Sequence, residues 1–179
     1  GVGGTPQSFV RAGTLGLPLM VAIIGGGFRQ FRPLVDLYRE AGQRAGHPPE
    51  RLKVGVHAIG FVGPTTQEAK DAFFPGWRHM FTEIGRERGW SPATRAQFDA
   101  MCSPEGAFLI GDPASVAAKT LAAGDALGGL SRVTFQMSAA SLGHAAMKRS
   151  IELLGTEVAP VVRQATAPRQ AVELETARG

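Results

Sequence analysis

The chain has 179 residues, 44% of them hydrophobic, and a formal net charge of +4, so it is long enough to bury one substantial core. Its basic residues are dispersed and not interleaved with aromatics, which argues against a nucleic-acid partner. The single cysteine, Cys102, excludes an intramolecular disulfide and is typical of a reducing compartment. No apolar run approaches the ~20 residues that span a bilayer. We therefore expect a globular, cytoplasmic protein without a membrane partner.

A glycine turn opens the chain. The residues before Gly3 have the character of a strand end, and a helix is expected over Phe9–Leu15. First-turn amides of a helix are unpaired, and the hydroxyls of Thr5 and Ser8 add further donors. The turn therefore predicts an anion pocket for a phosphate-bearing ligand, with a tight strand–helix turn as the alternative. It matches neither a P-loop, which needs a Gly-Lys pair, nor the dinucleotide fingerprint, which needs a glycine where Pro6 stands.

Four runs have strand character, and helical patterns separate them. The first is the stub before Gly3, and the others cover residues 17–24, 52–62 and 132–137. The run over 17–24 is apolar on both faces, which is typical of a parallel strand covered on both sides. This alternation of strand and helix predicts an α/β fold with a parallel sheet.

Capping signals place the helices. Pro33 marks a helix start that runs to about Gly46, and Asp112-Pro113 is a cap followed by proline at the first helical position, opening a helix over 114–126. A last helix is expected over 142–154, extending toward Arg163. Residues 165–179 lack periodicity and are expected to form a flexible tail.

The interval between the third and fourth strands is too long for one crossover. We expect a helical insertion over about 64–110, beginning at a capping box, Thr65 to Glu68, and containing helices over 77–89 and 91–101. An apolar stripe that includes Trp77, Met80 and Phe81 either covers a ligand as part of a lid or simply packs the helices together.

No catalytic constellation stands out. The four histidines lack metal-ligand spacing, so we expect no metal site. His57 lies within a predicted strand and His144 just after another; each is a candidate base or a satisfied structural histidine. Cys102 is expected to be a small buried hydrophobe.

Taken together, these segments resemble the C-terminal half of a bacterial luciferase-like flavin-dependent monooxygenase. The resemblance covers most of the chain, and it rests on the order and spacing of several soft motifs: Gly1-Val2-Gly3-Gly4-Thr5-Pro6-Gln7-Ser8, Gly16-Leu17-Pro18, Ile24-Gly25-Gly26, Pro33-Leu34-Val35-Asp36-Leu37-Tyr38, Gly111-Asp112-Pro113 and the closing run from Gly155 to Arg163.

The resemblance implies a (β/α)8 TIM barrel, of which residues 1–164 would form the C-terminal half. It also implies an enzyme that oxidises a small organic substrate with reduced FMN or a deazaflavin, with NAD(P)H as an indirect reductant. In such proteins the turn after the fifth strand holds the flavin phosphate, which assigns cofactor binding here to Gly4, Thr5, Gln7 and Ser8. Gly4 is a departure, because some luciferases carry an acidic side chain there. The catalytic residues stay unassigned.

The first four barrel strands would then precede Gly1, because a barrel needs ~250 residues. Half a barrel exposes two strand edges, so we expect association with the missing half or with a second copy. Two other functions stay open. One is a non-catalytic flavin-binding or interaction module on the same scaffold, and the other is a barrel enzyme that acts on a phosphorylated small molecule.

Overall fold

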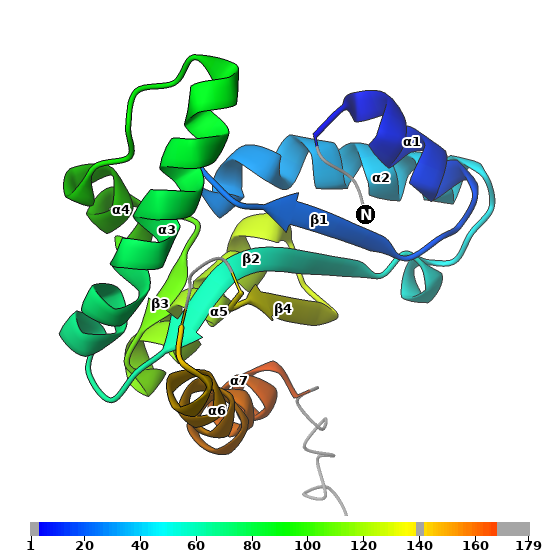
Figure 1. Ribbon diagram of the computed structural model, residues 1–179. Coiled ribbons are helices and arrows are strands. Elements are labelled where there is room, and N and C mark those ends of the chain that lie inside the picture. The colour runs from blue at the N-terminus through cyan, green and yellow to red at the C-terminus, as the bar shows by residue number, and fades with distance from the viewer. Residues whose placement is uncertain (1–3, 139–141, 168–179) are drawn as a thin grey trace, which may run out of the picture.

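The structure, a computed structural model, describes residues 4–138 and 142–167. Each strand is preceded and followed by at least one helix along the chain (Figure 1). Short 3-10 turns cover Phe28–Phe31 and Pro49–Arg51, and a π-helical turn, Leu154–Val158, joins the last two helices. The elements in chain order are α1 (Pro6–Thr14), β1 (Leu19–Ile23), α2 (Arg32–Arg44), β2 (Val54–Val62), α3 (Thr66–Arg88), α4 (Arg95–Cys102), β3 (Leu109–Gly111), α5 (Pro113–Leu127), β4 (Arg132–Gln136), α6 (His144–Leu153) and α7 (Ala159–Thr166).

The long strand β2 is the centre of a four-stranded sheet in which every pairing is parallel. β1 and β4 flank its first half, so that Val56 has Val21 on one side and Val133 on the other. β3 pairs with the second half of β2, where Phe61 lies opposite Ile110. Because the strands are parallel, the turns that follow them meet at one edge of the sheet.

The strands differ from the prediction at one place. The runs over 17–24, 52–62 and 132–137 contain β1, β2 and β4, whereas the stub before Gly3 lies outside the described residues. The additional strand, β3, falls inside the segment predicted to be a helical insertion. β3 has three residues, too few to show the alternation of apolar and polar side chains that indicates a strand, and the helix-capping signal at Asp112 follows it directly. The chain therefore returns to the sheet before α5 begins.

Two helix predictions also need correction. We expected a helix to begin near Trp77, but α3 runs without a break from Thr66 through Pro75. A proline removes one helical hydrogen bond, and here the burial of Phe73 and Trp77 on either side of it holds the helix together. The last helix continues to Thr166, into the segment expected to be a tail; residues 168–179 lie outside the described residues.

The main core covers one face of the sheet. Alternate residues of β1 and β2, such as Val21 and Val56, are fully buried there. Helices supply the other half of this core, with Phe9 from α1, Tyr38 from α2 and Leu127 from α5. Figure 1 shows α1 and α2 lying side by side beyond β1, with α6 and α7 at the opposite end of the sheet.

A second core forms on the opposite face, only where β2 ends. It consists of two groups of buried side chains, one from β2 and β3 and the other from α3, α4 and the residue before β3: Ile59, Phe61 and Ile110 against Phe73, Trp77, Phe98 and Phe108. The same face of the first half of β2 has no such cover among the described residues. We expected β1 to be covered on both sides, but Met20 and Ala22 are only half-buried.

Candidate functional site

The turn predicted to bind the cofactor lies at the start of α1. Gly4 has φ of +124°, a conformation that L residues rarely adopt. Thr5 is the N-cap of α1, yet its side chain makes no capping bond; instead its hydroxyl lies 2.8 Å from that of Ser8. The backbone amide of Ser8 donates to the Thr5 carbonyl at 3.0 Å. Two hydroxyls are thus held together at the start of a helix.

The surroundings of this turn favour an anion. The first turn of α1 contains no acidic side chain that would occupy the helix end. Thr5 and Gln7 are exposed and Ser8 is half-buried, so a ligand has access to all three. Pro6 contributes no hydrogen-bond donor to this turn, because proline has no backbone N–H. The structure therefore brings the four predicted residues together at the start of α1.

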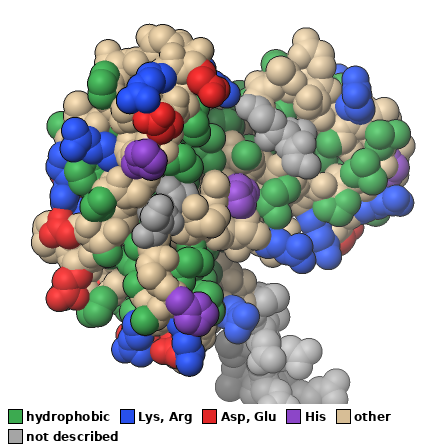
Figure 2. All heavy atoms as spheres, viewed as in Figure 1, with side chains coloured by type: hydrophobic (Ala, Val, Ile, Leu, Met, Phe, Trp, Pro, Cys, Tyr) green, Lys and Arg blue, Asp and Glu red, His purple; other side chains and the backbone are tan. Residues whose placement is uncertain are grey.

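A polar pair lies in the middle of the uncovered sheet face. His57 of β2 stands opposite Thr134 of β4, and its Nδ1 is 2.8 Å from the Thr134 hydroxyl oxygen. Both side chains are half-buried. On the other side, His57 faces Ala22, which is too small to cover the ring. In Figure 2, histidine and mixed polar and apolar side chains come to the surface between the α3–α4 part and the α1–α2 part.

Thr134 was not among the candidates from the sequence. The strand over 132–137 alternates, which places Thr134 on the same side as Gln136, but only the observed register shows that it faces His57. That register brings together two residues 77 positions apart. His144 is the first residue of α6, after β4 as predicted, with no hydrogen bond to His57 among the described residues.

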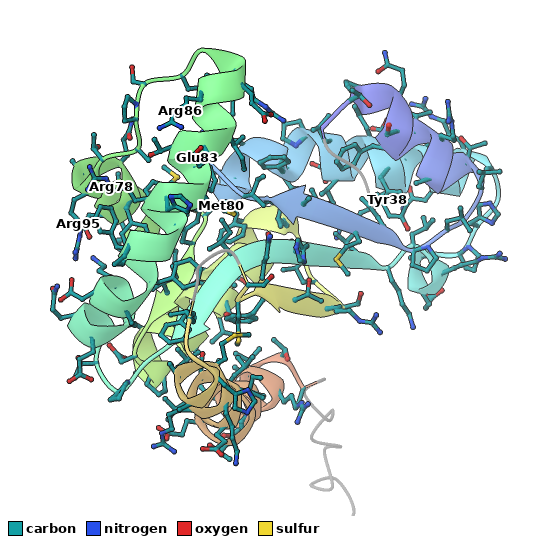
Figure 3. All side chains as sticks on the ribbon, in the orientation of Figure 1. Tyr38, Arg78, Met80, Glu83, Arg86 and Arg95 are labelled. Carbon is teal, nitrogen blue, oxygen red and sulfur yellow. The ribbon has the colours of Figure 1, made fainter. Side chains whose placement is uncertain are left out.

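The aromatic stripe on the α3–α4 segment serves mainly as packing. Trp77 is 3% exposed, and its ring centroid lies 4.9 Å from that of Phe81 and 5.1 Å from that of Phe98. Its indole N–H is buried without a hydrogen-bond partner among the described residues. Met80 is half-buried and lies on the side of α3 nearer the sheet (Figure 3).

The opposite side of α3 carries charge. A groove of about 490 Å³ runs between α3 and the connection to α4, and Figure 3 shows Arg78, Glu83 and Arg86 on that side of the helix. Arg86 pairs with Glu83 at 3.0 Å. Arg95 of α4 is paired with Asp71 at 2.7 Å, so much of this charge is already balanced.

Three further observations limit the chemistry of the described residues. They contain no group of three or more His, Cys, Asp or Glu side chains placed to hold a metal ion. Burial raises the pKa of the Cys102 thiol to about 11, which disfavours the nucleophilic thiolate. None of the helices in the described ranges is long and apolar enough to cross a membrane.

Comparison with known proteins gives a family. Residues 1–129 match the model of the luciferase-like monooxygenase family. The matched region includes the turn at Gly4–Ser8 and the strands β1, β2 and β3, and it ends before β4. No curated protein sequence matches the chain.

Solved structures share the fold. The oxygenating constituent of 3,6-diketocamphane monooxygenase from Pseudomonas putida, a type II Baeyer-Villiger monooxygenase in complex with FMN, superposes with a TM-score of 0.63 at 23% identity, over 86% of this chain and 45% of that one. A monooxygenase from Streptomyces bottropensis gives 0.65 at 20% identity, over 87% and 45%. The coenzyme F420-dependent tetrahydromethanopterin reductase from Methanopyrus kandleri gives 0.61 at 17% identity, over 88% and 49%.

These identities establish a common fold and no more than that. The chain spans about half the length of the solved proteins that it matches.

Proposed function

Because the chain belongs to the luciferase-like monooxygenase family, we propose that it is the C-terminal half of a (β/α)8 flavin-dependent oxidoreductase acting on a small organic substrate. The observation that carries this proposal is the turn from Gly4 to Ser8, which lies within the family match and opens the helix before β1. Parallel α/β barrels bind ligands at the edge of the sheet where strands end and helices begin.

The residues at this turn fit a flavin phosphate. A phosphate needs hydrogen-bond donors and a positive potential, and the paired hydroxyls of Thr5 and Ser8 stand at the positive end of α1 without a competing carboxylate. Gly4 has no Cβ, and no atom among the described residues lies within 4 Å of the place where one would stand, so a ligand can approach the backbone there. We assign the phosphate to Thr5 and Ser8, with Gly4 and the exposed Gln7 beside it.

When bound, reduced FMN or a deazaflavin supplies the redox chemistry, with NAD(P)H as an indirect reductant. The chain's own residues bind and orient the cofactor. Thr5 and Ser8 anchor the phosphate. The α3–α4 segment, residues 64–110, stands beside the sheet and limits the access of water from one side.

The open sheet gives a reason for association. Among the described residues, β1 and β4 pair only with β2, so each has an edge without a strand partner. Unpaired strand edges bind further strands readily. We propose that strands from an N-terminal half or from a second copy complete the sheet. Light scattering on the purified chain tests this: a stable monomer would contradict association with a second copy.

Flavin titration of the 179-residue chain tests the phosphate site. We expect FMN to quench or shift its fluorescence saturably on binding, and riboflavin, which lacks the phosphate, to bind at least about tenfold more weakly, since hydrogen bonds to a charged group contribute about 1.5–3 kcal/mol. The same titration with a phosphorylated deazaflavin distinguishes the two cofactor classes. Equal affinity for FMN and riboflavin would show that the turn does not bind the flavin phosphate.

Matched variants assign the residues. Replacing both hydroxyls, Thr5→Ala with Ser8→Ala, should bring FMN to the affinity of riboflavin. Thr14→Ala is the control, because its hydroxyl donates to the Val10 carbonyl at 3.0 Å at the other end of the same helix. Binding of FMN without substrate oxidation, when reductant and the completing strands are supplied, would favour a non-catalytic flavin-binding module instead.

A further inference from the structure

Lys119 of α5 holds the end of the α3–α4 segment in place. Its ammonium donates to the carbonyl oxygen of Met101 at 3.3 Å and to that of Phe108 at 2.7 Å. A third bond goes to the carbonyl of Ser103. Burial lowers the pKa of Lys119 to about 8, so at pH 7 the group keeps three N–H donors for these three acceptors. One half-buried side chain therefore holds the backbone at both ends of residues 103–106, which we call the strap.

The strap has few other contacts to hold it. Its two middle residues, Pro104 and Glu105, are exposed, and none of its side chains belongs to either apolar core. The residues that follow it, Ala107 and Phe108, are by contrast 0% and 1% exposed. Among the described residues, Lys119 is the only side chain outside the strap that donates a hydrogen bond to it. Segments with few buried apolar contacts open at a lower free energy than the core.

The strap lies against the turn that follows β1. A Cβ added at Gly27, in that turn, would stand 2.5 Å from the Glu105 carbonyl oxygen, so the two backbones approach closely. β1 ends at Ile23, and the turns that follow parallel strands meet at the edge of the sheet where α/β folds bind ligands. The strap therefore covers one turn of that edge.

We propose that Lys119 fastens the strap over the turn after β1, and that the strap opens and closes while the sheet stays folded. In the open form, Lys119 loses its carbonyl partners, and both the turn after β1 and the end of α4 become accessible to solvent. Lys119 acts through the backbone that it holds and is a positioning residue. The strap does not depend on the proposed function, because none of its residues belongs to the turn at Gly4–Ser8.

Native-state hydrogen exchange of the wild-type chain tests the opening. The backbone amide of Gly106 donates to the Ser103 carbonyl at 3.1 Å within the strap, so it exchanges when the strap opens. We expect this amide to exchange at least about tenfold faster than the amides of β2, at a rate that low concentrations of urea do not change, because local opening exposes little surface. Equal rates with equal urea dependence would show that the strap opens only when the whole chain unfolds, and would overturn the proposal.

The role of Lys119 is tested through Cys102, the only thiol of the chain, which directly precedes the strap. Lys119→Met should make this thiol react at least about tenfold faster with dithionitrobenzoate at pH 7, the factor expected for one lost hydrogen bond from a charged donor. Arg39→Met is the matched control, because Arg39 of α2 also donates to a backbone carbonyl of α5, that of Leu127 at 3.0 Å, at the other end of the helix. This variant should leave the reaction rate within about twofold of the wild-type rate.

The two variants distinguish a local fastening from a general loss of stability. If Cys102 reacted only after global unfolding, both variants would raise its reaction rate in proportion to the free energy of unfolding that each loses, which urea unfolding measures. That result, or an unchanged rate in Lys119→Met, would overturn the role of Lys119. The exchange measurement uses the wild-type chain, so it tests the strap whether or not Lys119→Met folds.

Discussion

The guanidinium of Arg39, in α2, donates to the carbonyl oxygen of Leu127, the last residue of α5, at 3.0 Å. It also donates to the carbonyls of Gly128 and Gly129, at 2.8 and 3.1 Å. The last carbonyls of a helix lack partners within the helix, and a cation there also favours the helix dipole. Arg39 therefore joins two helices that lie far apart in sequence, over the same face of the sheet.

Replacement of Arg39 should weaken the fold. We expect Arg39→Met to lower the free energy of unfolding by about 2 kcal/mol, because the carbonyls lose hydrogen bonds from a charged donor. Arg44→Met is the control: within the described part of the chain, Arg44 pairs only with Glu40, at 3.2 Å and exposed, which contributes under about 0.5 kcal/mol. Urea unfolding monitored by circular dichroism gives both values. Similar losses in the two variants would show that the Arg39 contacts contribute little.

Two helical glycines should respond in opposite directions to alanine. A Cβ at Gly13 would lie 2.2 Å from the Tyr38 carbonyl oxygen, where α1 packs on α2, whereas one at Gly124 meets nothing within 4 Å. Gly13→Ala should lower the free energy of unfolding by about 3 kcal/mol, because the added methyl group forces the two helices apart. Gly124→Ala should raise the free energy of unfolding by about 0.5–1 kcal/mol, since alanine favours a helix interior. Thermal unfolding compares them. A gain in both variants would mean that α1 is not held closely against α2.

The helix cap at Asp112 should make the free energy of unfolding depend on pH. Its carboxylate accepts from the hydroxyl of Thr66 and from the backbone amide of Ser115, and these bonds lower its pKa to about 2. Because the pKa is lower in the folded chain than the ordinary value of 3.8, the contribution is complete above that ordinary value and is lost as the pH falls toward 2.

Asp112→Ala should therefore lower the free energy of unfolding by about 1 kcal/mol near pH 7, as for other N-caps. The difference in this free energy between the variant and the wild type should shrink as the pH falls from 5 to 2. Urea midpoints measured across that range follow the change. Asp112→Asn separates charge from capping, because an amide oxygen still caps the helix. A difference that stays constant down to pH 2 would contradict the role of the ionised carboxylate.

Local capping signals in the sequence predicted two helix starts closely. Pro33 and the Asp112-Pro113 pair mark the beginnings of α2 and α5, because a proline in the first turn and a capping carboxylate act through near neighbours. Features that depend on distant partners were not visible. β3 is held by pairing with the end of β2, and α3 continues through Pro75 because aromatic packing compensates for the missing hydrogen bond.

The candidate site divides in the same way. The turn at Thr5 and Ser8 is contiguous, so its composition alone suggested an anion. The partner of His57 was not identified, because Thr134 reaches it only through the register of β4 on β2. The half-open face was also missed, since the apolar run of β1 has the same appearance whether one or both faces are covered.

The thiol of Cys102 should react slowly while the chain is folded. Burial raises its pKa from 9.0 to about 11, so at pH 8 the thiolate fraction falls by about a hundredfold. We expect a disulfide reagent such as dithionitrobenzoate to modify the folded protein at least that much more slowly than the urea-unfolded chain, where the same single cysteine is the internal control. Serine at this position should remove the reaction altogether. Equal rates in the folded and unfolded states would show that the end of α4, where Cys102 lies, opens readily.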